Sequence, residues 1–442
     1  MLEIIFSIFY VFLFAISFYK KKYVLFILPI FVFCYPNKLS FINIGDGFGL
    51  DDIFILFHFG LAIVSRKPKF SHIIEIRHWR LLNLMIFLTY VVTNLVGYGA
   101  DSFSNFVLMD FVKSALLFAY TYFICIIYCS SINRQEQIRS GKIALIIATV
   151  FQSIIAILVY HYTSSFSFFY DSTEVLLSGD VAFRAVGSLK GPWELGGFLA
   201  IGYVLIYTEL VFGRKSSRLL TIMLVFGLLF TIYALVISTS RASWLFVLAS
   251  TIVLFFKKPS KQLFYSFILV IVSFLLFQNY LDRVGELIMH RFLQTTASNN
   301  GALDNSSEER FIIWNKLYNN YDFTYALFGY GWQNFIRVFK TTPHNGFLSC
   351  FLAGGIIGTF VYFKFFYFIW KNQVVKVTRK FSNVNFGIPA IMAGLFVFSI
   401  TTDTLFTNSV FKMLTIVGTL SVHDYVFKLS AGMNLVEPER NI

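Results

Sequence analysis

Residues 219–237 read LLTIMLVFGLLFTIYALVI, and after the polar break STSRAS at 238–243 the chain becomes apolar again with WLFVLASTIVLFF at 244–256. An uncharged run of about 18 residues or more is typical of a helix that crosses a membrane. Similar runs recur along all 442 residues, of which 57% are hydrophobic and 13% charged, against about 25% charged in soluble domains. The sequence therefore predicts an all-α polytopic membrane protein, with residues 1–442 forming a single integral membrane domain.

The apolar runs predict about 12–13 transmembrane helices. The expected spans lie near residues 2–19, 23–36, 52–65, 81–98, 109–130, 143–161, 195–212, 219–237, 242–256, 262–281, 346–369, 386–403 and 408–426. Several of them are short and are candidates for tilted or re-entrant segments.

The net charge of +13 has an explanation that does not involve nucleic acid. Lys and Arg gather in the loops that follow the odd-numbered spans, for example Lys20 to Lys22, Arg214 with Lys215, and Lys257 with Lys258. Short basic loops remain in the cytoplasm, so we expect the N-terminus outside, the C-terminus inside and the even-numbered loops facing outward.

Two outward loops are long, one at 162–194 and a larger one at 282–345 before the third-last span. In the larger loop, Ser306 and Ser307 precede two acidic residues and then the pattern RFIIWNKLY at 310–318. Serine before an acidic first turn is typical of a helix start. We expect a short helix here, on or over the outer membrane face.

Two outward arginines are candidate ligands for an anion. Arg241 lies in the polar break between two spans, and Arg184 precedes the glycine-rich stretch GSLKGPWELGG at 187–197. A guanidinium keeps its charge and matches two phosphate oxygens at once, whereas an arginine at this depth can also reach the lipid headgroups. Glu194 is an alternative partner for Arg184.

His344 and Asn345 stand at the end of the larger loop, directly before a span. Histidine exchanges a proton near neutral pH and can act as a general base; an interfacial or capping role is the alternative. Four aromatic residues could stack on sugar faces or belong to the interfacial aromatic belt. They are Trp244, Trp314, Tyr330 and Trp332.

No motif in the sequence indicates a bound metal or cofactor. There is no HExxH, CxxC, P-loop or paired-aspartate motif, and the four cysteines lie in or beside apolar runs. We therefore expect neither metal nor cofactor, since arginine alone can neutralise the phosphates of an anionic ligand.

The polar blocks together resemble the O-antigen ligase and O-antigen polymerase superfamily. The chain has Ser240-Arg-Ala-Ser-Trp244 where the family has Ser-Arg-x-x-Trp, and Glu309-Arg-Phe-Ile-Ile-Trp314 with Gly329-Tyr-Gly331 and Phe335 where it has Arg-x-x-x-Trp and Gly-x-Gly-x-x-x-Phe. His344-Asn345 is similar to the family's His-Asn block, and Leu348, Gly355 and Gly358 to the glycine-rich span that follows it. The blocks cover roughly residues 180–360.

The resemblance implies a fold like that of the GT-C glycosyltransferases and metal-independent glycosyl transfer from an undecaprenyl-diphosphate-linked oligosaccharide. Arg184 and Arg241 would hold the diphosphate, and His344 would assist the attacking hydroxyl as base or positioner. The further substrate-binding residues that we expect are Arg310, Asn345, Ser240, Trp314 and Lys190.

The function that we expect is an O-antigen polymerase in the bacterial inner membrane, with its site facing the periplasm. An O-antigen ligase that transfers polymer to lipid A-core is the alternative, and a transporter of lipid-linked sugars is a second one. A transporter would show repeated halves and buried mid-membrane charges. The implied partners are the lipid-linked oligosaccharide, the bilayer, a chain-length regulator and a flippase.

Overall fold

The structure is a computed structural model that describes most, but not all, of the chain. It describes residues 1–19, 24–36, 50–65, 74–98, 112, 134–169, 173–177, 180–189, 191–213, 218–257, 305–332, 334–371, 387–403 and 409–430. The helices before residue 213 are α1 (Leu2–Tyr19), α2 (Val24–Cys34), α3 (Leu50–Ser65), α4 (Ile74–Tyr98), α6 (Arg134–His161), α7 (Thr163–Phe166) and α8 (Pro192–Phe212). The later ones are α9 (Arg218–Ser238), α10 (Arg241–Lys257), α13 (Asn305–Asn319), η2 (Phe323–Tyr325), α14 (Asn334–Phe339), α15 (Gly346–Ile369), α17 (Ile388–Thr401) and α18 (Ser409–Ser430).

The prediction of an all-α polytopic membrane protein is confirmed. Among the described residues, six helices are long and apolar enough to cross a membrane, namely α1, α4, α6, α8, α9 and α15. Every expected span overlaps a described helix, apart from 109–130 and 262–281, which lie outside the described residues except for Val112. The structure adds one feature that the sequence did not predict, a two-stranded antiparallel hairpin of β1 (Thr173–Leu177) and β2 (Asp180–Arg184).

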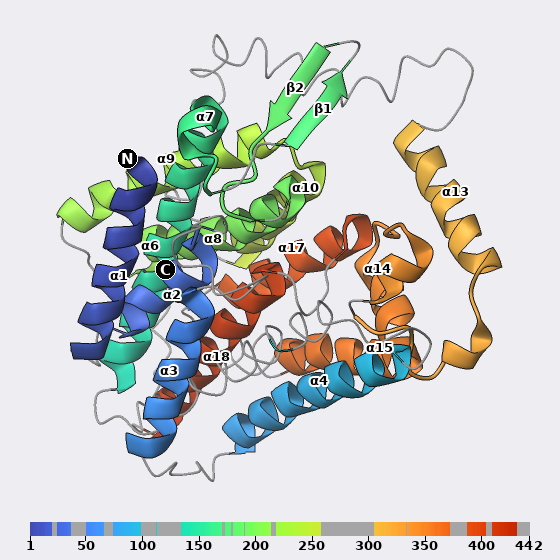
Figure 1. Cartoon of the computed structure of the whole chain (residues 1–442). Coiled ribbons are helices and arrows are strands. Elements are labelled where there is room, and N and C mark those ends of the chain that lie inside the picture. Colours follow the sequence, from blue (N-terminus) through green and yellow to red (C-terminus); the bar gives the residue numbers. More distant parts are fainter. Residues whose placement is uncertain are drawn as a thin grey trace.

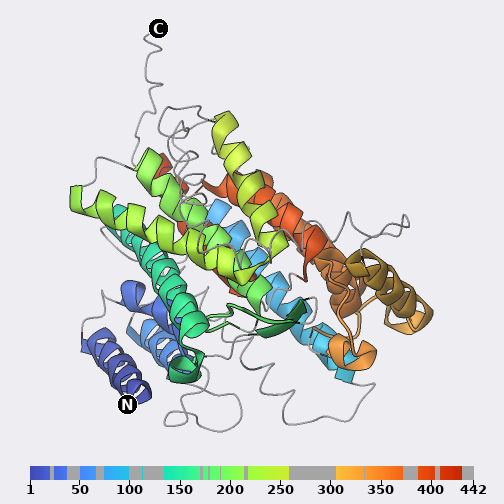
Figure 2. The same cartoon turned by 90° about the horizontal axis from the view of Figure 1, so that it is seen from above.

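The helices form one bundle, with the hairpin above it and α13 along its right-hand side in Figure 1. Seen from above, the N-terminus and α1 lie on one side of the bundle and α13 lies on the opposite side (Figure 2). The bundle packs closely at small residues, as helices in lipid must. Gly202 of α8 lies against Thr149 of α6, and Gly394 of α17 lies against Phe246 of α10.

Helices α6 and α8 run antiparallel, and this arrangement separates two polar ends. Lys142, near the start of α6, pairs with Glu209, near the end of α8, at 2.8 Å between Nζ and Oε2. In the second half of α6, Gln152 lies against the turn at Gly187 that precedes α8. The loop of Arg184 therefore lies at the end opposite to the Lys142–Glu209 pair, consistent with the predicted alternation of inner and outer loops.

Helices α10 and α17 also pack antiparallel, and their register places the start of one beside the end of the other. The Ser250 hydroxyl donates to the Ala390 carbonyl at 2.9 Å, and the ring centroids of Phe246 and Phe398 are 6.0 Å apart. If the same register is followed for about one more turn, toward the start of α10 and the end of α17, Arg241 lies level with Thr401. We call this end of the bundle, where α10 begins and α17 ends, the outer end, because the charge pattern of the sequence predicts that it faces outward.

Helix α15 is broken inside its apolar run. Gly355 has φ +61° and ψ −157°, a backbone conformation that residues with a Cβ rarely adopt. The peptide groups freed by the break are paired with residues 326–331 of the larger loop, and we call this paired region the α15 splice. The hydrogen bonds of the splice join Tyr330 N to Leu352 O (2.9 Å), Gly331 N to Ala353 O (2.8 Å), Ile356 N to Ala326 O (2.9 Å) and Ile357 N to Leu327 O (3.2 Å).

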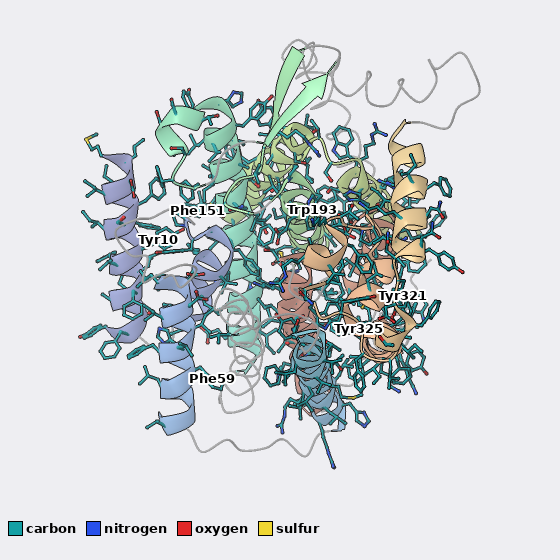
Figure 3. All side chains as sticks on the ribbon, turned by 45° about the vertical axis from the view of Figure 1, so that its right-hand side comes forward. Tyr10, Phe59, Phe151, Trp193, Tyr321 and Tyr325 are labelled. Atoms are coloured by element: carbon teal, nitrogen blue, oxygen red, sulfur yellow. The ribbon has the colours of Figure 1, made fainter. Side chains whose placement is uncertain are left out.

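An aromatic cluster supports the loop side of the splice. Tyr325 stacks on Tyr330 with ring centroids 4.5 Å apart, and Tyr321 meets Tyr330 edge to face at 5.7 Å. Figure 3 shows Tyr321 and Tyr325 near each other beside the bundle. Burial, together with the neighbouring Tyr330 and Asp322, raises the pKa of Tyr321 to about 12.

Candidate functional site

Arg184 ends β2 and holds the turn between α9 and α10. Its Nε donates to the Thr239 hydroxyl at 2.7 Å and to the Ser238 carbonyl at 3.2 Å, and a terminal nitrogen donates to the Thr239 carbonyl at 3.3 Å. The next residue, Ala185, donates its amide to the Ile237 carbonyl. The guanidinium is therefore fixed at the outer end, against the two residues, Ser238 and Thr239, that come shortly before Arg241 in the chain.

The turn that carries Arg241 is strained. Thr239 has φ +49°, an outlier for a β-branched residue that costs roughly 1–3 kcal/mol. Ser240 comes next and is buried, and its hydroxyl accepts a 2.7 Å hydrogen bond from Ser243 one turn into α10. Both serines lie against Gly196 of α8. This packing fixes the start of α10, where Arg241 is the first helical residue and is partly exposed.

His344 faces a carboxylate that the sequence did not reveal. Its Nδ1 lies 3.6 Å from Oδ2 of Asp403, and the histidine side chain is 52% exposed against 11% for the aspartate. The other aspartate oxygen accepts hydrogen bonds from the backbone amide of Asn345 and from the Ser349 hydroxyl. Asp403 is thus held in place, and the opposite ring nitrogen of His344, Nε2, points away from it.

Asn345 caps α15. Its side-chain oxygen accepts from the amides of Phe347 and Leu348, each at 3.0 Å, and its side-chain nitrogen donates to the Ile400 carbonyl at 3.2 Å. Both ends of the amide therefore join the start of α15 to the end of α17. The sequence did not predict this capping role for Asn345, and substrate contact by Asn345 stays a prediction.

Helix α13, the helix predicted in the larger loop, is joined to the same end by two side chains. The Trp314 indole donates to the Pro343 carbonyl at 2.8 Å, directly before His344. A terminal nitrogen of Arg310 donates to the Thr401 carbonyl at 3.5 Å. Both residues are partly buried, so α13 lies over the place where α15 begins and α17 ends.

The structure thus brings most of the predicted site residues to one end of the bundle. Arg184 contacts the turn before Arg241, the α10–α17 register places Arg241 level with Thr401, and Thr401 contacts Arg310. The His344–Asp403 pair lies two residues beyond Thr401. Three arginines and one histidine–carboxylate pair on a membrane-embedded scaffold can bind a phosphorylated group and accept a proton beside it.

The remaining candidates have different environments. Lys190 lies outside the described residues. Glu194 is buried and accepts the Ser409 amide at 2.8 Å, which joins α8 to α18. Tyr330 and Trp332 are buried in the core, so a glycan cannot stack on them in this structure. No group of three His, Cys, Asp or Glu side chains that could hold a metal ion occurs in the described part of the chain.

An Arg184→Ala variant is expected to lose thermal stability as well as function. The substitution leaves the Ser238 and Thr239 carbonyls without their charged donor, and hydrogen bonds to charged groups contribute about 1.5–3 kcal/mol. Arg184→Lys keeps the positive charge but not the planar guanidinium that makes several hydrogen bonds at once. We therefore expect this variant to lose only part of the thermal stability. A thermal unfolding scan of purified protein measures this, with exposed Lys316→Ala as the control. An unchanged Tm for Arg184→Ala would contradict a holding role for this residue.

The fold and site define a multi-pass membrane protein with a cationic, histidine-containing site at one end of its helices. Residues 225–363 match the family model described as O-antigen ligase. This match supports the predicted resemblance: residues 225–363 of the chain are similar to the O-antigen ligase family. The matched range includes Arg241, Arg310 and His344, but neither Arg184 nor Asp403. A search of curated proteins finds no match to the chain.

Proposed function

We propose that this protein is an O-antigen polymerase of the bacterial inner membrane, with its site facing the periplasm. Its family consists of glycosyltransferase-like enzymes of O-antigen processing. The observation that carries the proposal is the gathering of Arg184, Arg241 and Arg310 with the His344–Asp403 pair at the outer end. The proposed donor is an undecaprenyl-diphosphate-linked oligosaccharide, and the proposed acceptor is a lipid-linked repeat.

In the proposed reaction, a hydroxyl oxygen of the acceptor sugar attacks the anomeric carbon of the donor. The bond from that carbon to the diphosphate breaks, and undecaprenyl diphosphate leaves with both bonding electrons. Arg184 and Arg241, with Arg310, neutralise the charge that develops on the diphosphate. No metal or cofactor is part of this proposal.

The hydroxyl proton goes to His344. Nε2 accepts it, since Nδ1 faces Asp403. A carboxylate at this position orients the ring so that Nε2 can face the substrate. Asp403 is therefore a positioning residue in the proposal, and its contacts with Asn345 and Ser349 fix its own orientation.

A ligase is the second candidate, because the matching family model is described as O-antigen ligase. Polymerase and ligase use the same donor and differ in the acceptor, which for a ligase is lipid A-core. A transporter of lipid-linked sugars remains a weaker candidate, because the described charged side chains of the site gather at one end of the helices.

The decisive experiment is a lipopolysaccharide gel on a deletion strain complemented with the wild-type gene or with Arg241→Ala. A polymerase predicts that the deletion leaves core plus a single repeat, that the wild-type gene restores the ladder and that Arg241→Ala does not. Bare core, with polymer accumulating on the lipid carrier, would instead identify a ligase. An unchanged ladder in the deletion strain would contradict both reactions.

A further inference from the structure

Helix α13 has one face toward the bundle and one face that is exposed. Arg310, Ile313, Trp314 and Leu317 form the inner face, and Leu317 is 2% exposed. The outer face is formed by the remaining residues of the described turns, and it mixes apolar and polar side chains. These residues are Phe311, Ile312, Asn315, Lys316, Tyr318 and Asn319.

Three aromatic rings follow one edge of this helix. Phe311, Trp314 and Tyr318 have the spacing i, i+3 and i+7, so they lie in one row about 10 Å long. Phe311 and Trp314 meet edge to face, with ring centroids 5.6 Å apart. Phe311 is 56% and Tyr318 74% exposed. We call these three side chains the aromatic row.

Amide side chains lie directly beside the aromatic row. Asn315 and Asn319 are exposed and form a hydrogen bond with each other at 3.4 Å. An amide offers two donors and an acceptor, which suits sugar hydroxyls, while a ring face suits the apolar C–H face of a pyranose. On a helix that lies in a bilayer interface, the middle of the exposed face is apolar, whereas on α13 it holds these asparagines.

The aromatic row begins at the candidate site. Trp314 is the member that donates to Pro343 next to His344, and Arg310 on the same helix contacts Thr401. A sugar chain whose reacting residue lies at His344 therefore meets the ring of Trp314 first and can continue along α13. Helix α13 is held by these two contacts, so the rings are presented in a fixed orientation.

We propose that the aromatic row, with Asn315 and Asn319, is a binding platform for the saccharide of the substrate beyond its reacting sugar. The inference rests on the proposed function, because it takes the substrate to be an oligosaccharide. It assigns saccharide recognition to Phe311 and Tyr318, two residues that take no part in holding the diphosphate. The ligand class is a neutral or hydroxyl-rich glycan, bound through ring stacking and amide hydrogen bonds.

The test measures binding of a glycan that has neither lipid nor diphosphate. The probe is the oligosaccharide released by mild acid from the host strain's own surface polysaccharide, titrated into purified full-length protein in nanodiscs. Phe311→Ala and Tyr318→Ala are each expected to weaken binding roughly fivefold, and Tyr318→Phe to keep most of it. The matched control is Ile312→Ala, since Ile312 is 68% exposed on the same helix but away from the row.

Three results would overturn the platform. They are a wild-type protein that does not bind the glycan, alanine variants that bind it as tightly as wild type, and an Ile312→Ala variant that weakens binding as much as the row variants do. The last result would indicate that the whole exposed face contacts something else, such as the bilayer surface. The two proposals can fail separately. If the purified protein binds the glycan through the rings but the deletion strain keeps its normal ladder, the platform is supported and the proposed function is contradicted.

Discussion

A His344→Ala variant is expected to slow transfer about 1,000-fold, and Asp403→Asn to slow it about 100-fold. Loss of a general base costs about 10²–10⁴ in rate, and Asn at position 403 keeps the shape but removes the negative charge that faces Nδ1 of His344. The measurement is transfer by purified protein from a lipid-linked donor, over a range of pH values, with protein amounts matched.

A double variant with both His344→Ala and Asp403→Asn distinguishes a catalytic pair from two residues that act independently. Residues that act as a unit are not additive, so His344→Ala with Asp403→Asn should be no slower than His344→Ala alone. Ser349→Ala, which removes one of the hydrogen bonds to Asp403, is the milder control and should keep most of the rate. A double variant about 100-fold slower than His344→Ala would assign Asp403 a role independent of the histidine.

A Gly355→Ala variant is expected to fail to accumulate as folded protein. The φ of +61° is strained for alanine, and a Cβ at this position would lie 2.5 Å from both the carbonyl carbon and the oxygen of Leu327. Either the splice separates or α15 shifts, and in both cases peptide groups within an apolar helix lose their hydrogen bonds, each at a cost of several kcal/mol in lipid. The readout is the amount of monodisperse protein after detergent extraction.

Gly60→Ala is the matched control for this substitution. Gly60 lies in α3, and a Cβ there would have nothing within 4 Å, so the variant should accumulate like wild type. Gly329→Ala changes the loop side of the splice, where φ is +71° and a Cβ would lie 2.5 Å from the Gly355 amide nitrogen. It should resemble Gly355→Ala. A stable, monodisperse Gly355→Ala protein would show that the splice is dispensable for folding.

The apolar spans and the helix at 310–318 could be predicted from the sequence because each depends on local composition. The run at 219–237 coincides with α9, and the serine and acidic residues before Arg310 correctly indicated the start of α13. The break at Gly355 could not be predicted in this way. Its flanks remain apolar and helical, and its cause is a loop segment some 25 residues earlier in the chain.

Asp403 was missed for a similar reason. It is the last residue of the expected span 386–403 and stands in the short sequence Thr-Thr-Asp, a pattern too common to indicate chemistry. Its partners are 54 and 58 residues earlier in the chain, and only the packing of α15 beside α17 brings them together. The arginines and His344 were found because each stands out as a polar residue beside apolar spans. Whether they act on a substrate stays a prediction.

The α15 splice also bears on how such a protein can diversify. Its hydrogen bonds join backbone to backbone, so they place few demands on side chains beyond the glycines at the crossing. The side chains of the larger loop can then differ between homologous proteins, while the loop remains attached at the same place on the helix bundle. Under the proposed function, a scaffold of this kind can acquire a new sugar preference through point substitutions on α13, without rebuilding the end of the bundle where the proposed reaction would occur.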